Sequence, residues 1–131
     1  MIGLDTNVVV RLLTRDDPVQ ARRAADFIAD QAARNEPVFI SLVVLTETVW
    51  VLGSTYKYSH REIEAGLHGL LAADEFIVEQ RDALDEALRL KNRGRADFAD
   101  VFIEVANRTR GCSATATFDR RAMKHPGFVA L

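Results

Sequence analysis

The sequence has little cysteine and no long apolar run. A single cysteine, Cys112, in 131 residues excludes an internal disulfide framework, and no cysteine and histidine residues have the paired spacing of a zinc site. No stretch approaches the ~20 apolar residues that span a bilayer. The first residues, MIGLDTN, lack the basic segment followed by an apolar run that is typical of a signal peptide. We therefore expect a soluble, unprocessed protein of the reducing cytoplasm, without a membrane segment.

Motifs for several common chemistries are also missing. There is no GxSxG elbow, no Walker-type phosphate loop and no GxGxxG after a strand. The histidines His60, His68 and His125 are scattered, without the spacing of a metal cluster or a Ser-His-Asp triad, and we expect them at the surface or on helices. We expect Cys112, Trp50 and the phenylalanines in the core.

Charge is unevenly distributed along the chain. The formal net charge is -2, but residues 89–124 carry nine Lys or Arg against four acids, whereas the remainder carries eight basic and fifteen acidic residues. A basic segment of this kind suits a nucleic-acid backbone. A solvated helix face explains it equally well, so charge alone does not decide the function.

Length and pattern predict one α/β domain. No linker, repeat or low-complexity tract interrupts the chain, and 48% of its residues are hydrophobic. Strands alternate with helices, which favours an open, mostly parallel sheet covered on both faces, with ligands at the carboxyl ends of the strands. The sequence predicts that Ser41 caps one helix and that Ser59 and Glu62 form a capping box at the start of another. It also predicts Pro18 in the first turn of a helix and Gly94 at the end of one. The predicted strands are residues 1–5, 37–41, 76–80, 112–118 and 128–131.

Glu47 and Asp5 stand out among the carboxylates. Glu47 is the only charged residue in 37–56, inside a helix that otherwise reads as buried, so it needs a cation, a hydrogen-bond partner or a salt bridge to a distant arginine. Asp5 ends the first strand and stands before the polar Thr6 and Asn7. It either caps the next helix or contributes oxygen ligands at the sheet edge.

The remaining acids have structural alternatives. Asp97 and Asp100 begin a predicted helix, where the first can be a cap, and with Glu104 they form a stripe that a solvated acidic face explains most simply. Asp119 follows a predicted strand and can also cap the short helix predicted after it. Carboxylates gathered at one sheet edge would raise one another's pKa unless a cation neutralised them, and oxygen ligands suit Mg²⁺ or Mn²⁺.

Three segments together resemble a known family. They are LDTNVVVRLL, SLVVLTETVWVL, and ADFADVFIEVA followed by TATFDRR. In this order and at these separations, the chain resembles VapC-type toxins, the PIN-domain ribonucleases of bacterial and archaeal toxin–antitoxin pairs. The resemblance covers essentially the whole chain. It implies a single PIN domain over residues 1–131, a three-layer α/β/α fold with a central, mostly parallel sheet of four to five strands.

The resemblance also implies an activity and a site. The activity is Mg²⁺-dependent (or Mn²⁺-dependent) endoribonuclease cleavage, in which a metal-activated water hydrolyses an RNA phosphodiester bond. The implied partners are RNA, a VapB-type antitoxin that inserts into a groove near the active site, and a second copy in a homodimer. A non-catalytic module, either a Mg²⁺-binding receiver-like domain or a PIN scaffold, is the alternative. The implied metal-binding and catalytic acids are Asp5, Glu47, Asp100 and Asp119; supporting residues are Thr6, Asp97 and Thr117; and residues that could contact RNA phosphates are Arg93, Arg95, Arg120 and Arg121.

Overall fold

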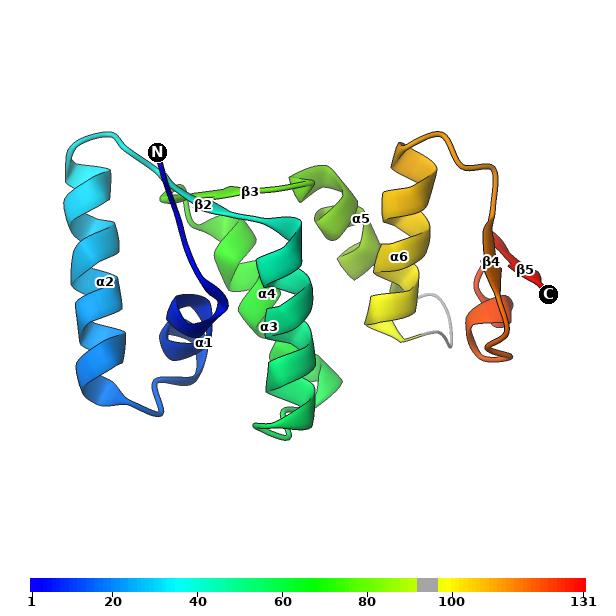
Figure 1. The fold of residues 1–131 in the computed structure, drawn as a ribbon, viewed down its shortest axis with the longest axis horizontal. Helices are drawn as coiled ribbons and strands as arrows, with labels where there is room; N and C mark the ends of the chain where they lie inside the picture. The colour runs from blue at the N-terminus through cyan, green and yellow to red at the C-terminus, as the bar shows by residue number, and fades with distance from the viewer. Residues whose placement is uncertain (92–96) are drawn as a thin grey trace. The chain divides into compact units, whose positions relative to one another are not determined.

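A computed structural model describes residues 1–91 and 97–131 and divides the chain into two compact units, Met1–Glu79 and Gln80–Leu131 (Figure 1). The first unit contains β1 (Ile2–Gly3), α1 (Thr6–Thr14), α2 (Pro18–Ala33), β2 (Val38–Ile40), α3 (Leu42–Ser54), α4 (His60–Ala72) and β3 (Phe76–Val78). The second contains α5 (Arg81–Lys91), α6 (Phe98–Thr109), β4 (Thr115–Thr117), the 3-10 helix η1 (Ala122–Lys124) and β5 (Phe128–Ala130). In the described part of the chain, no helix is both long and apolar enough to cross a membrane. The predicted end of a helix at Gly94 lies outside the described residues.

The strands pair in parallel, as the alternating pattern predicts. The first unit has the order β1-β2-β3, and helices α1–α2 and α3–α4 supply the crossovers that parallel neighbours need. In the second unit β4 pairs with β5, with Thr115 opposite Phe128. The predicted α/β fold is confirmed, but the described strands form a three-stranded and a two-stranded sheet instead of one sheet of four to five strands. Strand pairing joins residues that are far apart in sequence, so the apolar sequence of one strand does not reveal which strands lie next to it.

Local signals mark the helix starts as predicted. The Ser41 hydroxyl accepts a hydrogen bond from the backbone N–H of Val44 (3.2 Å) at the start of α3. Ser59 and Glu62 form a capping box at the start of α4, and Pro18 begins α2. These predictions are confirmed, because capping depends on residues only a few positions apart.

Several side chains lie in surroundings opposite to those that the sequence predicts. Trp50 and Phe118 are 68% and 82% exposed instead of lying in the core. Cys112 is exposed and precedes β4, so its predicted place inside a strand is wrong. His125 and Glu104 are buried, although the sequence predicts a histidine at the surface or on a helix and a solvated acidic stripe. Burial depends on which distant element covers a residue, and the local pattern does not contain that information.

Candidate active site

Asp5 lies between the end of β1 and the start of α1. Its backbone carbonyl accepts hydrogen bonds from the N–H groups of Val8 and Val9, so it occupies the N-cap position. The carboxylate itself makes no capping bond to the helix; Nδ2 of Asn7 donates to its Oδ2 at 3.5 Å. Side-chain capping therefore does not explain this exposed carboxylate, which is open to a ligand.

Glu47 on α3 is hydrogen-bonded to Thr6 on α1. The Thr6 hydroxyl donates to Oε2 of Glu47 at 2.9 Å, and Thr6 is buried. Glu47 is exposed, so its predicted place in a buried helix face is wrong. Because α3 is apolar on most sides, its sequence does not reveal which face packs inward. Among the described residues no Lys or Arg forms an ion pair with Glu47, and a structural salt bridge is therefore not its role there.

Three carboxylates of the second unit interact electrostatically. Asp97 occupies the N-cap position of α6, and the half-buried Asp100 lies in its first turn. Burial raises the pKa of the Asp100 carboxyl above its ordinary value, and the charges of Asp119 and Asp97 raise it further. Asp97 makes no capping bond through its side chain; its Oδ1 lies 3.7 Å from Nη2 of Arg121 in an ion pair. Negative charge is therefore concentrated at this end of α6.

Asp119 lies in the turn between β4 and η1. Its backbone N–H donates to the Thr117 hydroxyl oxygen at 3.0 Å, and its Oδ1 accepts from the backbone N–H of Arg121 at 2.7 Å. These two bonds between near neighbours fix the shape of the turn. They hold the Asp119 carboxylate at an exposed position.

The arginines expected to contact RNA are described only in part. Arg120 and Arg121 are exposed and follow Asp119 directly. Arg93 and Arg95 lie outside the described residues. The guanidinium of Arg121 forms an ion pair with Asp97.

The oxygen donors at these positions fit a hard divalent cation. Asp5 and Glu47 belong to the first unit, and Asp100 and Asp119 belong to the second. Carboxylate oxygens suit Mg²⁺ and Mn²⁺, and across residues 1–91 and 97–131 none of these four is neutralised by an ion pair with Lys or Arg. Over the same residues, no group of three or more His, Cys, Asp or Glu side chains is arranged as a metal-binding cluster. The fit to a cation therefore rests on the chemistry of the carboxylate oxygens in each unit.

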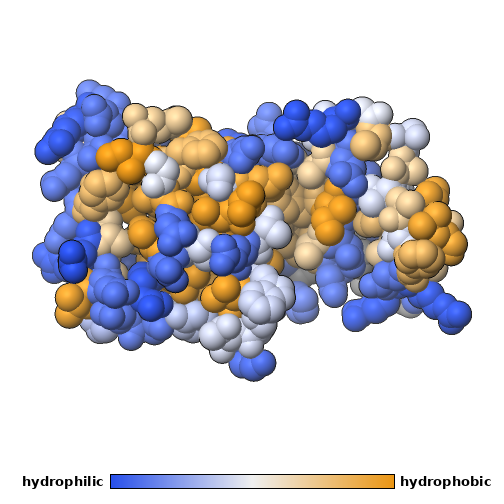
Figure 2. Space-filling view, viewed as in Figure 1, coloured by the Kyte–Doolittle hydropathy of each residue, from blue (hydrophilic) through white to orange (hydrophobic). Residues whose placement is uncertain are grey.

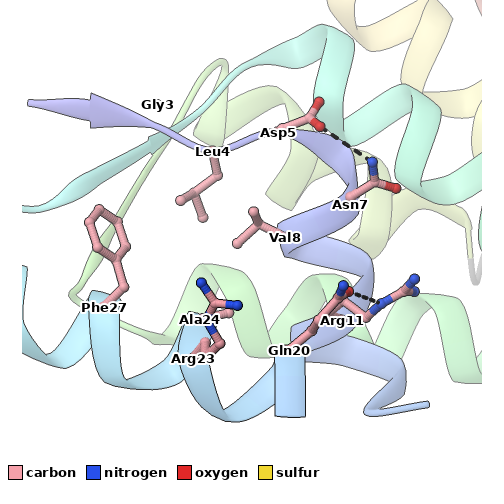
Figure 3. A pocket seen from close by; sticks show the side chains of 10 residues that line it. All are labelled: Gly3, Leu4, Asp5, Asn7, Val8, Arg11, Gln20, Arg23, Ala24 and Phe27. Carbon is pink, nitrogen blue, oxygen red and sulfur yellow. Dashed lines mark hydrogen bonds between the residues drawn. The ribbon is translucent and has the colours of Figure 1, made fainter. Parts of the chain in front are cut away.

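A pocket of about 530 Å³ in the first unit borders Asp5 (Figure 3). Its residues come from the end of β1 and from α1 and α2, and they combine apolar and basic side chains. The sequence does not mark Arg23 or Phe27 as site residues, because both fit the ordinary stripes of an amphipathic helix. The apolar side chains are Leu4, Val8, Ala24 and Phe27, and the polar ones include Asp5, Arg11, Gln20 and Arg23.

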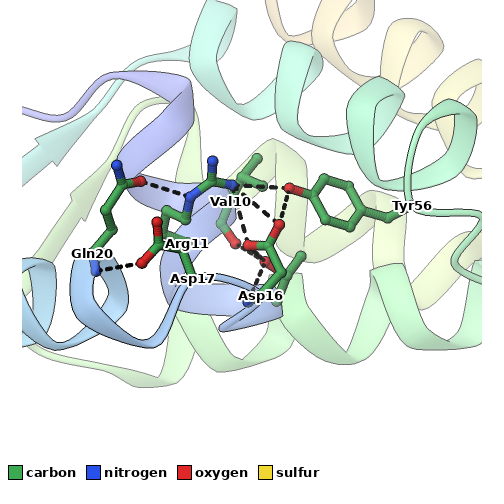
Figure 4. Close-up of polar contacts among 7 residues, drawn as sticks. Val10, Arg11, Asp16, Asp17, Gln20 and Tyr56 are labelled. Carbon is green, nitrogen blue, oxygen red and sulfur yellow. Dashed lines mark hydrogen bonds and ion pairs between the residues drawn. The ribbon is translucent and has the colours of Figure 1, made fainter.

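Arg11, on the pocket wall, is held by a hydrogen-bond network (Figure 4). Its Nε donates to Gln20 at 2.8 Å, and its Nη1 donates to the Tyr56 hydroxyl at 2.9 Å and to Asp16 at 3.1 Å. The Tyr56 bond is the main reason that the pKa of Arg11 lies above its ordinary value. Arg23 has no hydrogen bond or ion pair to any described residue, so its guanidinium is the one available to a ligand in this pocket.

Comparison with known proteins identifies the family to which the chain belongs. The family model of the PIN domain matches residues 2–128, and the chain therefore belongs to the PIN-domain family. The chain is also similar to the VapC ribonuclease of Aquifex aeolicus (strain VF5). The two are 25% identical over 121 residues, which cover 92% of this chain and 89% of the relative. The family resemblance of the sequence is confirmed.

Proposed function

We propose that this PIN-domain protein is the toxin of a toxin–antitoxin pair and an endoribonuclease that depends on Mg²⁺ or Mn²⁺. Family membership and the Aquifex relative support this proposal. One structural observation carries it: no described Lys or Arg forms an ion pair with the carboxylate of Asp5, Glu47, Asp100 or Asp119. We infer that these four acids bind the cation and that residues 1–131 act as one PIN domain. A bound divalent cation activates water and neutralises charge that develops on a phosphodiester.

The other residues of the site orient the acids and the substrate. The Thr6 hydroxyl orients Glu47, and Thr117 shapes the turn that carries Asp119. Asp97 forms an ion pair with the guanidinium of Arg121, whose charge also acts on Asp100. We propose that Arg120 and Arg121, together with Arg93 and Arg95, contact RNA phosphates, which fix the position of a strand without reading its sequence. We propose that the protein acts on RNA in the cytoplasm.

The test replaces single acids by their amides. We expect Asp5→Asn and Asp100→Asn to abolish RNA cleavage and growth arrest while circular dichroism stays unchanged. Asp85→Asn is the matched control, because Asp85 is an exposed acid on α5 paired with Arg89 at 3.5 Å. EDTA should inactivate the wild type, and Mg²⁺ or Mn²⁺ should restore it. Metal-dependent cleavage at the wild-type rate by either amide variant would show that the proposed site is wrong.

The same proteins distinguish an enzyme from a non-catalytic module. A receiver-like domain or an inactive PIN scaffold would bind Mn²⁺ in titration calorimetry but would produce no new RNA ends after brief expression. New ends that depend on Asp5 and Asp100 support the enzyme. Mapping those ends also identifies the class of RNA that is cleaved.

We also propose that the pocket beside Asp5 is the docking groove for an antitoxin of the VapB type. Val8, Ala24 and Phe27 offer an apolar wall that suits one face of a helix, and the available guanidinium of Arg23 suits an acidic side chain. A segment bound there would lie against Asp5. Occupation of the pocket would therefore inhibit the site directly.

A homodimer is the proposed assembly, with the exposed face of α3 as its contact. Val43 and Trp50 on this helix are 73% and 68% exposed, and Figure 2 shows apolar residues reaching the surface over α3. An exposed aromatic side chain near an aliphatic one is typical of a protein contact. Glu47 lies one turn from Trp50 on the same helix, so dimerisation would place a subunit boundary near the proposed active site.

A further inference from the structure

The second unit contains a buried carboxylate that the proposed reaction does not use. Glu104 lies on α6, one turn after Asp100, and it is 5% exposed. An ionised carboxylate is costly to bury unless opposite charges or hydrogen bonds surround it. The partners of Glu104 therefore matter more than those of an ordinary surface acid.

Two basic side chains flank the Glu104 carboxylate. Nε of Arg108 donates to Oε1 at 3.0 Å, and Nη2 of the same guanidinium donates to Glu86 on α5 at 2.8 Å. Beside the other oxygen, Nε2 of His125 lies 3.6 Å from Oε2, and His125 is itself 6% exposed. Glu104 thus joins its own helix to the segment that contains His125.

Gly127 leaves the space that the Glu104 side chain occupies. A Cβ atom at Gly127 would lie 2.5 Å from Oε1 of Glu104. The φ of Gly127 is +97°, a conformation that residues with a side chain rarely adopt. On either side of it, the rings of His125 and Phe128 are in edge contact. The backbone therefore passes directly against the carboxylate, and only glycine allows this approach.

The segment held by Glu104 is also the one that carries Asp119. Residues 115–131 form β4, the Asp119 turn, η1 and β5, and the two strands pair with each other. Asn107 of α6 supplies a second attachment, since its Nδ2 donates to the Thr115 hydroxyl oxygen at 3.1 Å. Asp100 lies on the helix, and Asp119 lies on the attached segment. Their separation therefore depends on how firmly the helix and the segment are joined.

We propose that Glu104 is a positioning residue, which together with His125 and Gly127 fixes residues 115–131 on α6 and thereby sets the separation of Asp100 and Asp119. The inference rests on the proposed function of these two acids as metal ligands. Glu104 acts through them and contacts neither RNA nor the cation. Small displacements of catalytic groups lower the rate of the chemical step more than they lower substrate affinity.

The experiment compares Glu104→Gln with Asp85→Asn in the full chain. The glutamine keeps the shape of the side chain and removes its charge, whereas Asp85→Asn removes the exposed acid of α5. We expect Glu104→Gln to lower kcat by about 10- to 100-fold and to weaken Mn²⁺ binding in titration calorimetry, with KM for RNA unchanged. Amide hydrogen exchange should accelerate in residues 115–131 and stay unchanged in residues 1–79. Asp85→Asn should match the wild type in all four measurements.

Two outcomes would overturn the proposal: a folded Glu104→Gln with wild-type kcat and exchange, or a loss of kcat that merely follows the unfolded fraction. Should Glu104→Gln fail to fold, His125→Gln removes the imidazole from the same contact and is measured in the same way. An inactive wild-type chain would instead refute the proposed nuclease function. In that case Mn²⁺ affinity and hydrogen exchange still decide whether Glu104 holds the segment.

Discussion

The hydroxyl of Thr6 donates a hydrogen bond to Oε2 of Glu47, 2.9 Å away, and so joins the residue that follows Asp5 to an acid 41 positions further along the chain. Thr6→Val keeps the shape of the side chain and removes the donor. Because Glu47 is exposed, we expect a loss of only about 1 kcal/mol in the free energy of unfolding, measured in urea. The kcat for RNA cleavage should fall as well, since the carboxylate loses its orientation.

Thr6→Ser is the control for this bond, because serine keeps the hydroxyl. It should cleave RNA at close to the wild-type rate. If Thr6→Val is as active as Thr6→Ser, the hydrogen bond does not orient Glu47 for the reaction.

Arg22 and Arg23 are neighbours on α2 with different surroundings. Arg23 lines the pocket beside Asp5, whereas Arg22 pairs with Asp26 at 3.2 Å. We expect Arg23→Glu to weaken the binding of a co-expressed antitoxin by about 10-fold or more and to restore growth arrest in its presence, because reversed charge repels an acidic partner. Arg22→Glu should bind normally. Copurification and growth assays measure both effects, and equal losses would implicate the net charge of α2 instead of the pocket.

Trp50 is expected to stabilise the homodimer. Trp50→Ala should shift the protein toward monomer in size-exclusion chromatography with light scattering, because a large aromatic contact is lost. Val19→Ala is the control, since Val19 is also exposed, at 69%, but lies on α2. A wild-type protein that stays monomeric at high concentration would refute the proposed dimer.

The pair of Asp16 and Tyr56 predicts a pH-dependent contribution to stability. The Tyr56 hydroxyl donates a hydrogen bond of 2.7 Å to Asp16, and this bond is the main reason that the pKa of Asp16 lies below its ordinary value of 3.8. A hydrogen bond from the Thr14 hydroxyl lowers the pKa further. Because the folded-state pKa is lowered, ionised Asp16 stabilises the fold above pH 3.8, and the effect is lost as the pH falls through the lowered value.

Tyr56→Phe should therefore be less stable than the wild type at about pH 7, and the difference should shrink at an acidic pH well below 3.8. Urea unfolding at the two pH values measures this change. A difference that stays the same at both would mean that Tyr56 contributes through packing alone.

The sequence by itself determined the local features and the family. The Ser41 cap and the capping box of Ser59 and Glu62 follow from residues three positions apart, so no distant contact can hide them. The alternation of strands and helices predicted parallel pairing, which the structure contains. The motifs around Asp5 and Asp119 also indicated the PIN-domain family, because a motif depends only on the order of residues in the sequence.

Only the tertiary structure decided which side chains are buried and which acids have partners. It exposes Glu47 and Trp50 on an almost wholly apolar helix. It also buries His125 beside Glu104, a residue that the sequence predicts on a solvated acidic face. Periodicity shows that a helix has an apolar side, but the element that covers that side comes from elsewhere in the chain. The bond between Thr6 and Glu47 likewise exists only because folding brings α1 and α3 together.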